Sequence, residues 1–411
     1  MDGTAGFRAL LTPAGQALLA EAGSADLSES GLLATAERLR RHHPADLVAA
    51  ALTQARLRAK AAAKFGPDAA RMYFTPDGLQ QATRPNVAAH RARRFRTGPV
   101  LELCCGIGGD LIARARAGRA SVGVDSDPLT VAVARANIDA LGLADIAVVR
   151  EGAAERANPD GYTAVFADPG RRTARGRVFD PKEYQPPLDR LLALASRAPG
   201  ACLKVAPGIP YDAVPADAEV EWISTGGEVK EAAIWLGALA GDTGRRATIL
   251  PPILPADGAV VDGSPATLVP VPGLGHPPVG PWRRYLYEPD GAVIRAHLVA
   301  EVAADVDGCL VDPRIAYITS DTLRATPFAT AYEIHDVLPF SVKRLRRALR
   351  DRRAGILTIK KRGSAVDIER LRHELRPQGP EHATVVLTRI GAAPVALLCA
   401  PVRYPKQINA Q

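Results

Sequence analysis

The sequence predicts an α/β protein in which a doubly wound parallel sheet follows a helical N-terminal region and precedes a smaller α+β domain. From residue 98 onward, short apolar runs alternate with helical stretches, the pattern of parallel strands covered by helices on both faces. A glycine-rich turn at 106–109 joins the first apolar run to the next helix. Beyond residue 283, strands and helices mix in a basic segment, which predicts a separate domain.

The composition is that of a folded globular chain. Of the 411 residues, 47% are hydrophobic and 23% are charged, which excludes disorder of the whole chain. No apolar run is long enough for a membrane span, and we expect no secretory signal. The five cysteines form no C-x-x-C pair and the histidines are scattered. We therefore expect no metal site, no disulfide framework and a cytoplasmic location.

Residues 1–97 are expected to be helical. Apolar residues recur at helical spacing in two stretches, one around Leu32 to Leu39 and one from Leu47 to Ala61. Pro44 separates these two helices. An extended aromatic piece follows at 72–76, where Thr75 can cap a further helix that starts at the next residue, a proline.

Residues 98–240 are expected to form the parallel sheet. Apolar runs predict strands at 100–105, 120–124, 146–149, 163–167 and 201–205. Helices are expected from Asp110, over 128–141 and over 185–195. The runs 219–224 and 232–239, separated by two glycines, are expected to close the sheet as an antiparallel pair. The sequence thus predicts about seven strands.

A segment rich in proline and glycine, 241–282, is expected to be a linker, and 283–411 a basic α+β domain. In that domain the pattern predicts a hairpin around Pro289-Asp290-Gly291 and a second one from 384–388 with 395–399. Between them it predicts helices over 341–350 and 367–375 and a strand over 355–361. Residues 341–376 hold 13 Lys or Arg against 4 Asp or Glu. Such clustered positive charge favours a polyanionic partner.

The glycine-rich turn is the strongest functional signal. It reads Cys105-Gly106-Ile107-Gly108-Gly109 and stands between a strand and a helix, where glycines let a nucleotide approach the backbone. Asp125 ends the following strand and can accept both hydroxyls of a ribose. A nicotinamide site would need a third glycine at position 111, which is leucine here. The pattern therefore favours another nucleotide cofactor.

At these residues the sequence resembles the class I S-adenosylmethionine-dependent methyltransferases, whose first loop reads acid-x-Gly-x-Gly-x-Gly. Glu102 takes the acid position, Gly106 and Gly108 the second and third glycines, and Cys104 stands where the first glycine is usual. Asp125 matches the ribose-binding acid. The resemblance implies a Rossmann-like seven-stranded methyltransferase sheet and S-adenosyl-L-methionine as cofactor, bound by Glu102, Cys105 and the loop glycines. The adenine contacts would come from the backbone, or from Glu151 or Glu155.

Asp168 and Pro169 end the fourth predicted strand and are the expected catalytic residues. In methyltransferases that act on amines, this strand ends in Asp/Asn-Pro-Pro-aromatic. An acceptor pair there, a side-chain oxygen and a carbonyl, can hold the two N–H groups of an amine and aim its lone pair at the methyl group. Here Gly170 and Arg171 replace the second proline and the aromatic residue. Arg171 and Arg172 are expected to stack on the substrate or to bind a phosphate.

The segment before the sheet resembles the trimethylguanosine synthase group, which has an aromatic-x-Thr-Pro-Glu segment and a Cys-Gly-x-Gly-Gly-Asn loop. The corresponding residues here are 73–79 and 105–110. The resemblance implies methylation of a base amine in RNA and places Phe74 among the substrate-binding residues. The C-terminal segment resembles the THUMP-like modules of bacterial methyltransferases. The Pro-Pro-Trp signature of the synthase group is absent, so the cap substrate is not carried over.

The expected function is methyl transfer from S-adenosylmethionine to a base amine of structured RNA, with no membrane and no metal involved. Two alternatives stay open: a methyltransferase for a small acidic molecule bound by Arg171 and Arg172, and a non-catalytic RNA-binding protein with a vestigial cofactor fold. An intact glycine loop and Asp168 argue against the second alternative. The basic C-terminal charge argues against the first. In the basic C-terminal domain, the residues expected to contact phosphates are Lys343, Arg346, Arg347, Lys360, Lys361 and Arg362.

Overall fold

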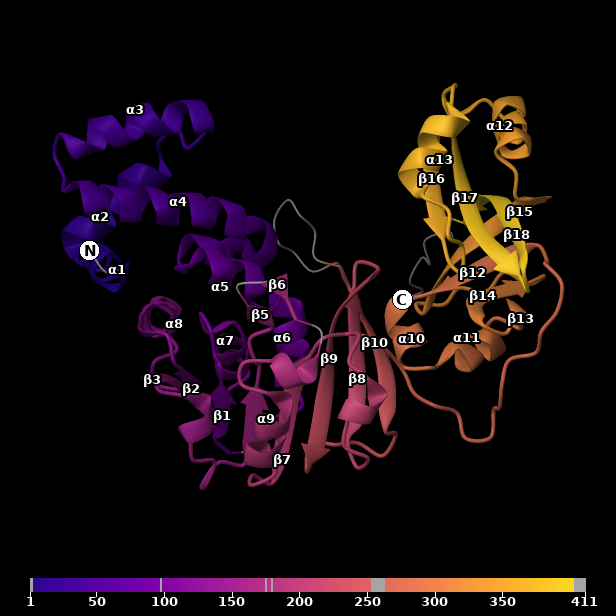
Figure 1. The fold of residues 1–411 in the computed structure, drawn as a ribbon. Helices are drawn as coiled ribbons and strands as arrows, with labels where there is room; N and C mark the ends of the chain where they lie inside the picture. The colour runs from indigo at the N-terminus through magenta and orange to yellow at the C-terminus, as the bar shows by residue number, and fades with distance from the viewer. Residues whose placement is uncertain (1–2, 97, 174–175, 179, 253–262, 403–411) are drawn as a thin grey trace, which may run out of the picture. The chain divides into compact units, whose positions relative to one another are not determined.

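The computed structural model describes residues 3–96, 98–173, 176–178, 180–252 and 263–402, and the chain divides into two compact units (Figure 1). Unit 1 comprises Met1–Gly226, Lys230–Gly244 and Leu250–Pro265. Unit 2 comprises Gly227–Val229, Arg245–Ile249 and Ala266–Gln411.

Unit 1 begins with helices, as predicted. They are α1 (Gly3–Leu10), α2 (Pro13–Gly23), α3 (Glu29–Arg40), α4 (Ala45–Phe65), α5 (Pro76–Gln81) and α6 (Pro85–Ala92). Side chains cap three of these helices: Thr12 accepts the amide of Gly15 in α2, Ser28 that of Gly31 in α3, and Thr75 that of Gly78 in α5. The apolar faces of α1, α2 and α4 share one buried cluster with the helix α8 (Pro128–Ala140) that covers the sheet.

The larger sheet has the strand order β11-β10-β8-β9-β7-β4-β1-β2-β3. Its strands are β1 (Val100–Leu103), β2 (Ser121–Asp125), β3 (Ala147–Glu151), β4 (Ala164–Ala167), β7 (Gly200–Val205), β8 (Glu219–Thr225), β9 (Glu228–Gly237), β10 (Arg245–Leu250) and β11 (Ala266–Leu268). The first five are parallel to one another, and β9 joins β7 antiparallel. Helices α7 (Gly109–Arg116), α8 and α9 (Leu188–Ala195) connect the parallel strands. The predicted α/β class is confirmed.

Two strands of this larger sheet were not expected. β10 and β11 lie within 241–282, the segment predicted to be a linker, and they pair antiparallel with Thr248 opposite Thr267. β11 is only three residues long and has prolines near both ends. The alternation of apolar and polar residues that indicates a strand is therefore not visible in the sequence. Among the described residues the sheet therefore has nine strands instead of seven. A short separate ribbon, β5 (Arg172–Thr173) with β6 (Gly176–Arg177), follows β4.

Unit 2 contains a seven-stranded sheet with the order β13-β14-β12-β15-β18-β17-β16. The strands are β12 (Tyr285–Pro289), β13 (Cys309–Asp312), β14 (Ile315–Ser320), β15 (Ala329–Pro339), β16 (Ala354–Lys361), β17 (Glu381–Ile390) and β18 (Ala393–Pro401). The helices are α10 (Gly291–Arg295), α11 (Val299–Asp305), α12 (Val342–Asp351) and α13 (Ile368–Leu375). The predicted hairpin of β17 and β18 and the predicted helices α12 and α13 are present.

The predicted hairpin around Pro289-Asp290-Gly291 is wrong. β12 instead pairs with β14 and β15, and residue 291 begins the helix α10. The side chain of Asp290 accepts the amide of Ala292 at 2.8 Å and so caps the helix. Asp before Gly therefore acts here as a helix cap and not as a hairpin turn. No helix in the described ranges is long and apolar enough to cross a membrane.

Candidate functional site

A cavity of about 670 Å³ lies at the carboxyl ends of β1, β2 and β4 in unit 1. The glycine loop, the end of β2 and the helix α5 each contribute to its walls. Of the residues predicted to bind the cofactor, the cavity is lined by Glu102, Cys105, Gly106 and Asp125, and Asp168 lines it from β4. The parallel strands thus bring these residues to one edge of the sheet.

The glycine loop turns through left-handed backbone. Gly106 has φ 55° and Gly108 has φ 88°, conformations that residues with a Cβ rarely adopt. Cys104, which stands at the usual place of the first glycine, also has a positive φ of 59°. The Gly106 amide donates to Asp125 Oδ2 at 2.9 Å, so the end of β2 holds the loop in place. Asp125 Oδ1 accepts the amide of Asp127 at 3.1 Å.

The side chains beneath the loop are tied to buried cations. Glu102 is 1% exposed and forms an ion pair with Arg114 of α7. Burial raises the pKa of Glu102 to about 8, although Arg114 opposes this. Asp110, at the start of α7, pairs with Arg91 at 2.6 Å. Burial would raise the pKa of Asp110, but the charges of Arg91, Lys204 and Arg114 and the hydrogen bond from Thr83 together outweigh it, so the net pKa is below the usual value. These acids thus anchor the loop and the helix.

Asn137 of α8 connects the aromatic segment with the glycine loop. It is fully buried, its Nδ2 donates to the carbonyls of Tyr73 and Ile107, and its Oδ1 accepts the Tyr73 amide at 2.6 Å. Phe74 is 1% exposed and packs its ring on Phe65, with the ring centroids 5.4 Å apart. The structure therefore places Phe74 in the helical core. It does not line the cavity at the glycine loop, whereas its neighbour Thr75 does.

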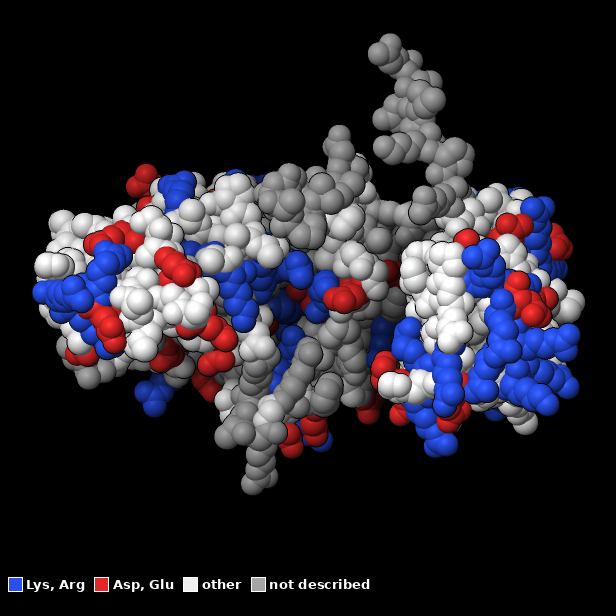
Figure 2. Space-filling model, turned by 90° about the horizontal axis from the view of Figure 1, so that it is seen from above, with Lys and Arg blue, Asp and Glu red and all other residues white. Residues whose placement is uncertain are grey.

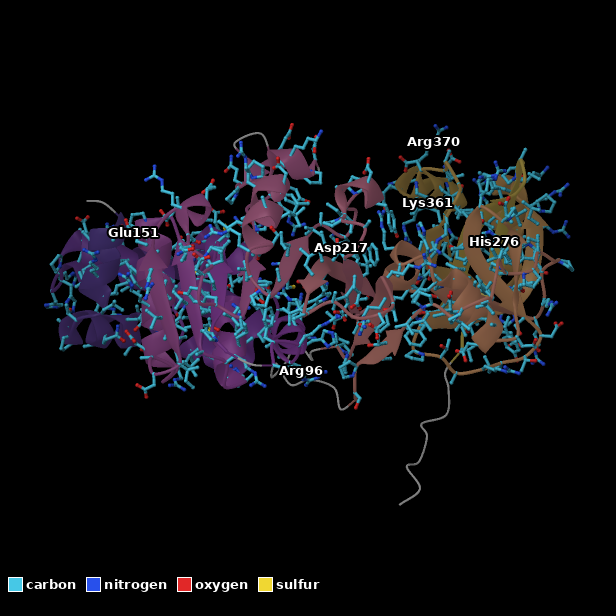
Figure 3. The ribbon with its side chains drawn as sticks, turned by 90° about the horizontal axis from the view of Figure 1, so that it is seen from below. Arg96, Glu151, Asp217, His276, Lys361 and Arg370 are labelled. Carbon is cyan, nitrogen blue, oxygen red and sulfur yellow. The ribbon has the colours of Figure 1, made fainter. Side chains whose placement is uncertain are left out.

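The two acids considered for the adenine side are placed differently. Glu155 lines the cavity together with Ala153 and Ala154. Glu151, labelled in Figure 3, is the last residue of β3, is exposed and does not contribute to the lining. Of the pair, only Glu155 is in a position to contact a molecule in the cavity.

A second cavity of about 350 Å³ shares five lining residues with the first: Gln81, Ala82, Thr83, Asp168 and Gly170. Positive side chains dominate its walls: Lys64, Arg84, Arg171, Lys204 and Lys230. Its carboxylates are Asp168 and Glu231. Pro169 lines this cavity and not the first, whereas Asp168 lines both. The predicted catalytic pair thus stands at the boundary between the two cavities.

A chain of hydrogen bonds runs from Asp168 into the interior. Lys204 Nζ lies 2.5 Å from Asp168 Oδ2 and also donates to Thr83 Oγ1 at 2.9 Å. Thr83 in turn donates to Asp110 Oδ2 at 2.8 Å. Asp110 is paired with Arg91, whose Nε lies 3.0 Å from Glu231 Oε1. The charges around Asp168 are therefore coupled to those that anchor α7.

The network includes residues outside the predicted site. Lys204 and Glu231 both line the second cavity. Lys64, Thr83 and Arg84 were not singled out. Their signal is weak because they lie before the sheet, and only the packing of α4, α5 and α6 brings them to Asp168. Arg171 lines the second cavity as expected for a substrate-binding residue. The side chain of Arg172 lies outside the described residues.

Most of the predicted phosphate contacts of unit 2 serve the fold instead. Arg346 donates to the Glu374 carbonyl at the end of α13, and Lys361 donates to the Val366 carbonyl. Lys360 pairs with Glu288 at 2.5 Å, and Arg362 donates to the Ala316 carbonyl. These four cations are thus engaged within the domain.

The exposed positive charge of unit 2 lies along α12. Lys343, Arg344, Arg347 and Arg350 are exposed there, while Leu345 and Leu349 of the same helix are buried. Figure 2 shows Lys and Arg gathered over this unit. Arg370 of α13, labelled in Figure 3, is 81% exposed and pairs with Glu374. In the described part of the chain, no group of three or more His, Cys, Asp or Glu side chains is arranged to hold a metal ion.

Comparison with family models gives two matches. Residues 329–401 match the family described as THUMP domain-like, which confirms the resemblance of the C-terminal segment. Residues 3–61 match a family described as a domain of unknown function, DUF8688.

Whole-chain comparisons point to one family. Two curated Mycobacterium tuberculosis proteins, from strains CDC 1551 / Oshkosh and ATCC 25618 / H37Rv, are described as uncharacterized S-adenosylmethionine-dependent methyltransferases. Each is 36% identical over 361 residues, covering 85% of this chain and 95% of the relative. A putative methyltransferase from Porphyromonas gingivalis W83 has a solved structure with a TM-score of 0.71 and 19% identity, over 92% of this chain and 99% of that one, which shows the same fold. The chain belongs to the S-adenosylmethionine-dependent methyltransferases.

Proposed function

We propose that this enzyme transfers the methyl group of S-adenosylmethionine to an amine nitrogen of a base in structured RNA. The observation that carries the proposal is the position of Asp168, which lines both cavities at the end of β4. A residue at this boundary can contact an acceptor in the second cavity while the acceptor nitrogen reaches into the first.

The residues of the first cavity fit the cofactor. Asp125 is half-buried at the end of β2, and its carboxylate can accept both hydroxyls of a ribose. Gly106, which lines this cavity, carries no side chain where the backbone must be approached closely, whereas Gly108 of the same loop is not among the lining residues. Glu155 lines the wall next to the end of β3, on the adenine side. S-adenosylmethionine, when bound, supplies an electrophilic methyl group on a sulfonium.

The role of Asp168 and Pro169 follows from the weak nucleophilicity of an exocyclic amine. Asp168 Oδ2 is held by Lys204, which fixes the orientation of the carboxylate. Its other oxygen, Oδ1, and the carbonyl of Pro169 can each accept one N–H of the amine. The lone pair of the nitrogen then points away from both acceptors, towards the methyl group. Positioning of this kind accounts for a large part of a transfer barrier.

The RNA acceptor is supported by charge. The chain has a net charge of +8, and α12 presents four exposed Lys or Arg side chains on its outer face. Exposed cations of this kind bind the phosphate backbone without reading its sequence. The second cavity, at about 350 Å³ and with positive walls, favours a second candidate acceptor, a small acidic molecule.

The test is transfer of a labelled methyl group from S-adenosylmethionine to total RNA and, separately, to a small-molecule extract. We expect Asp168→Ala to lose transfer to RNA while it keeps cofactor affinity within a few-fold, because the amine is positioned mainly in the transition state. Asp168→Asn is the matched variant that keeps the shape of the side chain. Undiminished transfer by the alanine variant would remove Asp168 from the mechanism, and label found only in small molecules would favour the second candidate.

A further inference from the structure

We propose that the second cavity is a phosphate subsite, in which Lys64, Arg84 and Arg171 bind a phosphate group carried by the methyl acceptor. The inference rests on the proposed function in that the acceptor nitrogen is placed at Asp168. It adds to that function a chemical requirement on the acceptor: a phosphate must lie close to the methylated amine.

The first argument is the balance of charge in the cavity walls. Five cations line the cavity against two carboxylates. Both carboxylates already have cationic partners, since Asp168 is paired with Lys204 and Glu231 with Arg91. Lys64, Arg84 and Arg171 face the cavity without a further carboxylate in its described walls to balance them. A bound anion would supply the missing negative charge.

The second argument concerns donors that the protein leaves unused. Arg171 Nη1 is buried and has no hydrogen-bond partner among the described residues. A buried guanidinium nitrogen without an acceptor is costly, and a phosphate oxygen is an acceptor that suits it. Lys64 Nζ has three N–H donors, and one of them donates to the Leu79 carbonyl at 2.8 Å. Both side chains can therefore bind a further acceptor.

The third argument is the cost of holding Lys64 where it is. Its ammonium group is partly buried beside two other cations, Lys204 and Arg84. The pKa of Lys64 is lowered to about 8. Burial is the largest cause, and the charges of these two neighbours add to it. A cation held against both burial and repulsion gains most from an anion between it and its neighbours. The position of Lys64 thus agrees with the charge balance.

The location relative to Asp168 defines where the phosphate lies in the acceptor. Arg171 is three residues after Asp168, and both line the second cavity together with Lys64 and Arg84. The cavity is about 350 Å³ in volume, so a phosphate inside it and a nitrogen at Asp168 belong to the same nucleotide or to adjacent ones. Such a phosphate can come from an RNA backbone or from a small phosphorylated molecule, and the experiment separates the two sources.

The experiment measures binding of inorganic phosphate and of pyrophosphate to the full chain by calorimetry. The variants are Lys64→Met and Arg171→Met. The matched control is Lys60→Met, an exposed lysine one turn earlier on the same helix that lies outside the cavity. We expect each cavity variant to weaken binding about tenfold, the loss of roughly one charge-assisted hydrogen bond. Lys60→Met should bind as the unchanged protein does, and Lys64→Arg should restore binding.

S-adenosylmethionine binding by each variant shows whether it is folded, because the cofactor cavity does not include the substituted residues. Equal phosphate affinity in Lys64→Met, Arg171→Met and the unchanged protein would overturn the subsite. Competition then identifies the source: displacement of phosphate by structured RNA assigns it to RNA, and displacement only by nucleoside monophosphates assigns it to a small acceptor. Phosphate binding without methyl transfer to RNA keeps the subsite and contradicts the proposed function. Methyl transfer to RNA without phosphate binding contradicts the subsite and keeps the proposed function.

Discussion

Lys204 Nζ of β7 and Asp168 Oδ2, directly after β4, lie 2.5 Å apart. β4 and β7 run parallel with Ala167 opposite Leu203. The residues that follow these two, Asp168 and Lys204, therefore lie side by side. The register of two neighbouring strands thus positions the predicted catalytic acid. Through Thr83 the same lysine is connected to Asp110 and the helix that follows the glycine loop.

The Asp125 carboxylate should account for much of the cofactor affinity. Asp125→Ala removes the acceptors of the ribose hydroxyls and of the Gly106 amide, and we expect binding to weaken by about 1–3 kcal/mol. Calorimetry with S-adenosylmethionine measures the loss. Asp125→Asn retains one oxygen for the Gly106 amide and should lose less. NAD should not bind either protein, and tight NAD binding with no S-adenosylmethionine binding would contradict the assignment of the cavity.

Lys64 should make stability depend on pH. Its pKa in the folded protein is about 8, below the ordinary value of about 10.4 that the unfolded chain retains. Between these values the unfolded state binds more protons, so the free energy of unfolding rises with pH across this window. Lys64→Met should therefore be more stable than the unchanged protein at pH 7, by about 1–3 kcal/mol, and the difference should vanish near pH 10.

Urea unfolding at pH 7 and pH 10 tests this expectation. Lys60→Met, on the exposed side of the same helix, should show no such change between the two pH values. A stability difference for Lys64→Met that is the same at both pH values would show that its ammonium is not held at a lowered pKa.

The exposed cations of α12 should make RNA binding depend on salt. Replacing Lys343, Arg344 and Arg347 together by glutamine should reduce the slope of log affinity against log salt by about 2–3, since each phosphate contact contributes roughly 0.7–0.9. These side chains are exposed, and Arg347 is 86% exposed, so the fold should persist. A fluorescence titration over a range of salt concentrations measures the slope.

A matched triple variant removes the same charge elsewhere in unit 2, at Arg283, Arg284 and Arg314. Its slope should stay close to that of the unchanged protein. Equal slopes for both triple variants would mean that α12 is a solvated surface. Truncation before Ser341 is a poor test, because it removes β18, which pairs with β15, and so destroys the sheet.

Cys104 should carry backbone strain that glycine relieves. Its φ of 59° lies in the left-handed region, which costs a residue with a Cβ about 1–2 kcal/mol. Glycine costs roughly 0.5–1 kcal/mol in the entropy of the unfolded chain, so Cys104→Gly should be neutral or stabilising by up to about 1 kcal/mol. Chemical unfolding measures it, with Cys104→Ala as the control that keeps the strain. A clear loss of stability in the glycine variant would contradict the expectation.

Local sequence patterns predicted the parts of the fold that local patterns can specify. The apolar runs predicted the strands β1 to β4 and β7 to β9. The glycine loop with Asp125 indicated the cofactor edge, because strand, turn and helix follow each other directly there. The helix α10 was missed because Asp290-Gly291 is compatible with both a turn and a helix cap, and only the pairing of β12 with β15 decides between them. β11 was missed because it is too short for its alternation to show.

The second cavity could not have been predicted in the same way. Lys64 and Asp168 are distant in sequence, and the packing of helices against the sheet brings them to one cavity. Ion pairs also decide which cations can bind a partner. Lys360 and Arg362 look like a basic cluster in the sequence, but both face Glu288. Counting charges locates basic segments, and only the contacts show which cations remain exposed.

The bonds of Asn137 have a consequence for how the catalytic part can be isolated. This side chain joins the carbonyls of Tyr73 and Ile107, and α5 forms a wall of the cofactor cavity. A fragment cut at residue 98 would contain the complete Rossmann-like core and still lack that wall, leaving a buried amide with one of its acceptors gone. Fragments made for expression should therefore keep the helical region. The minimal catalytic fragment must begin upstream of the residues that complete this cavity.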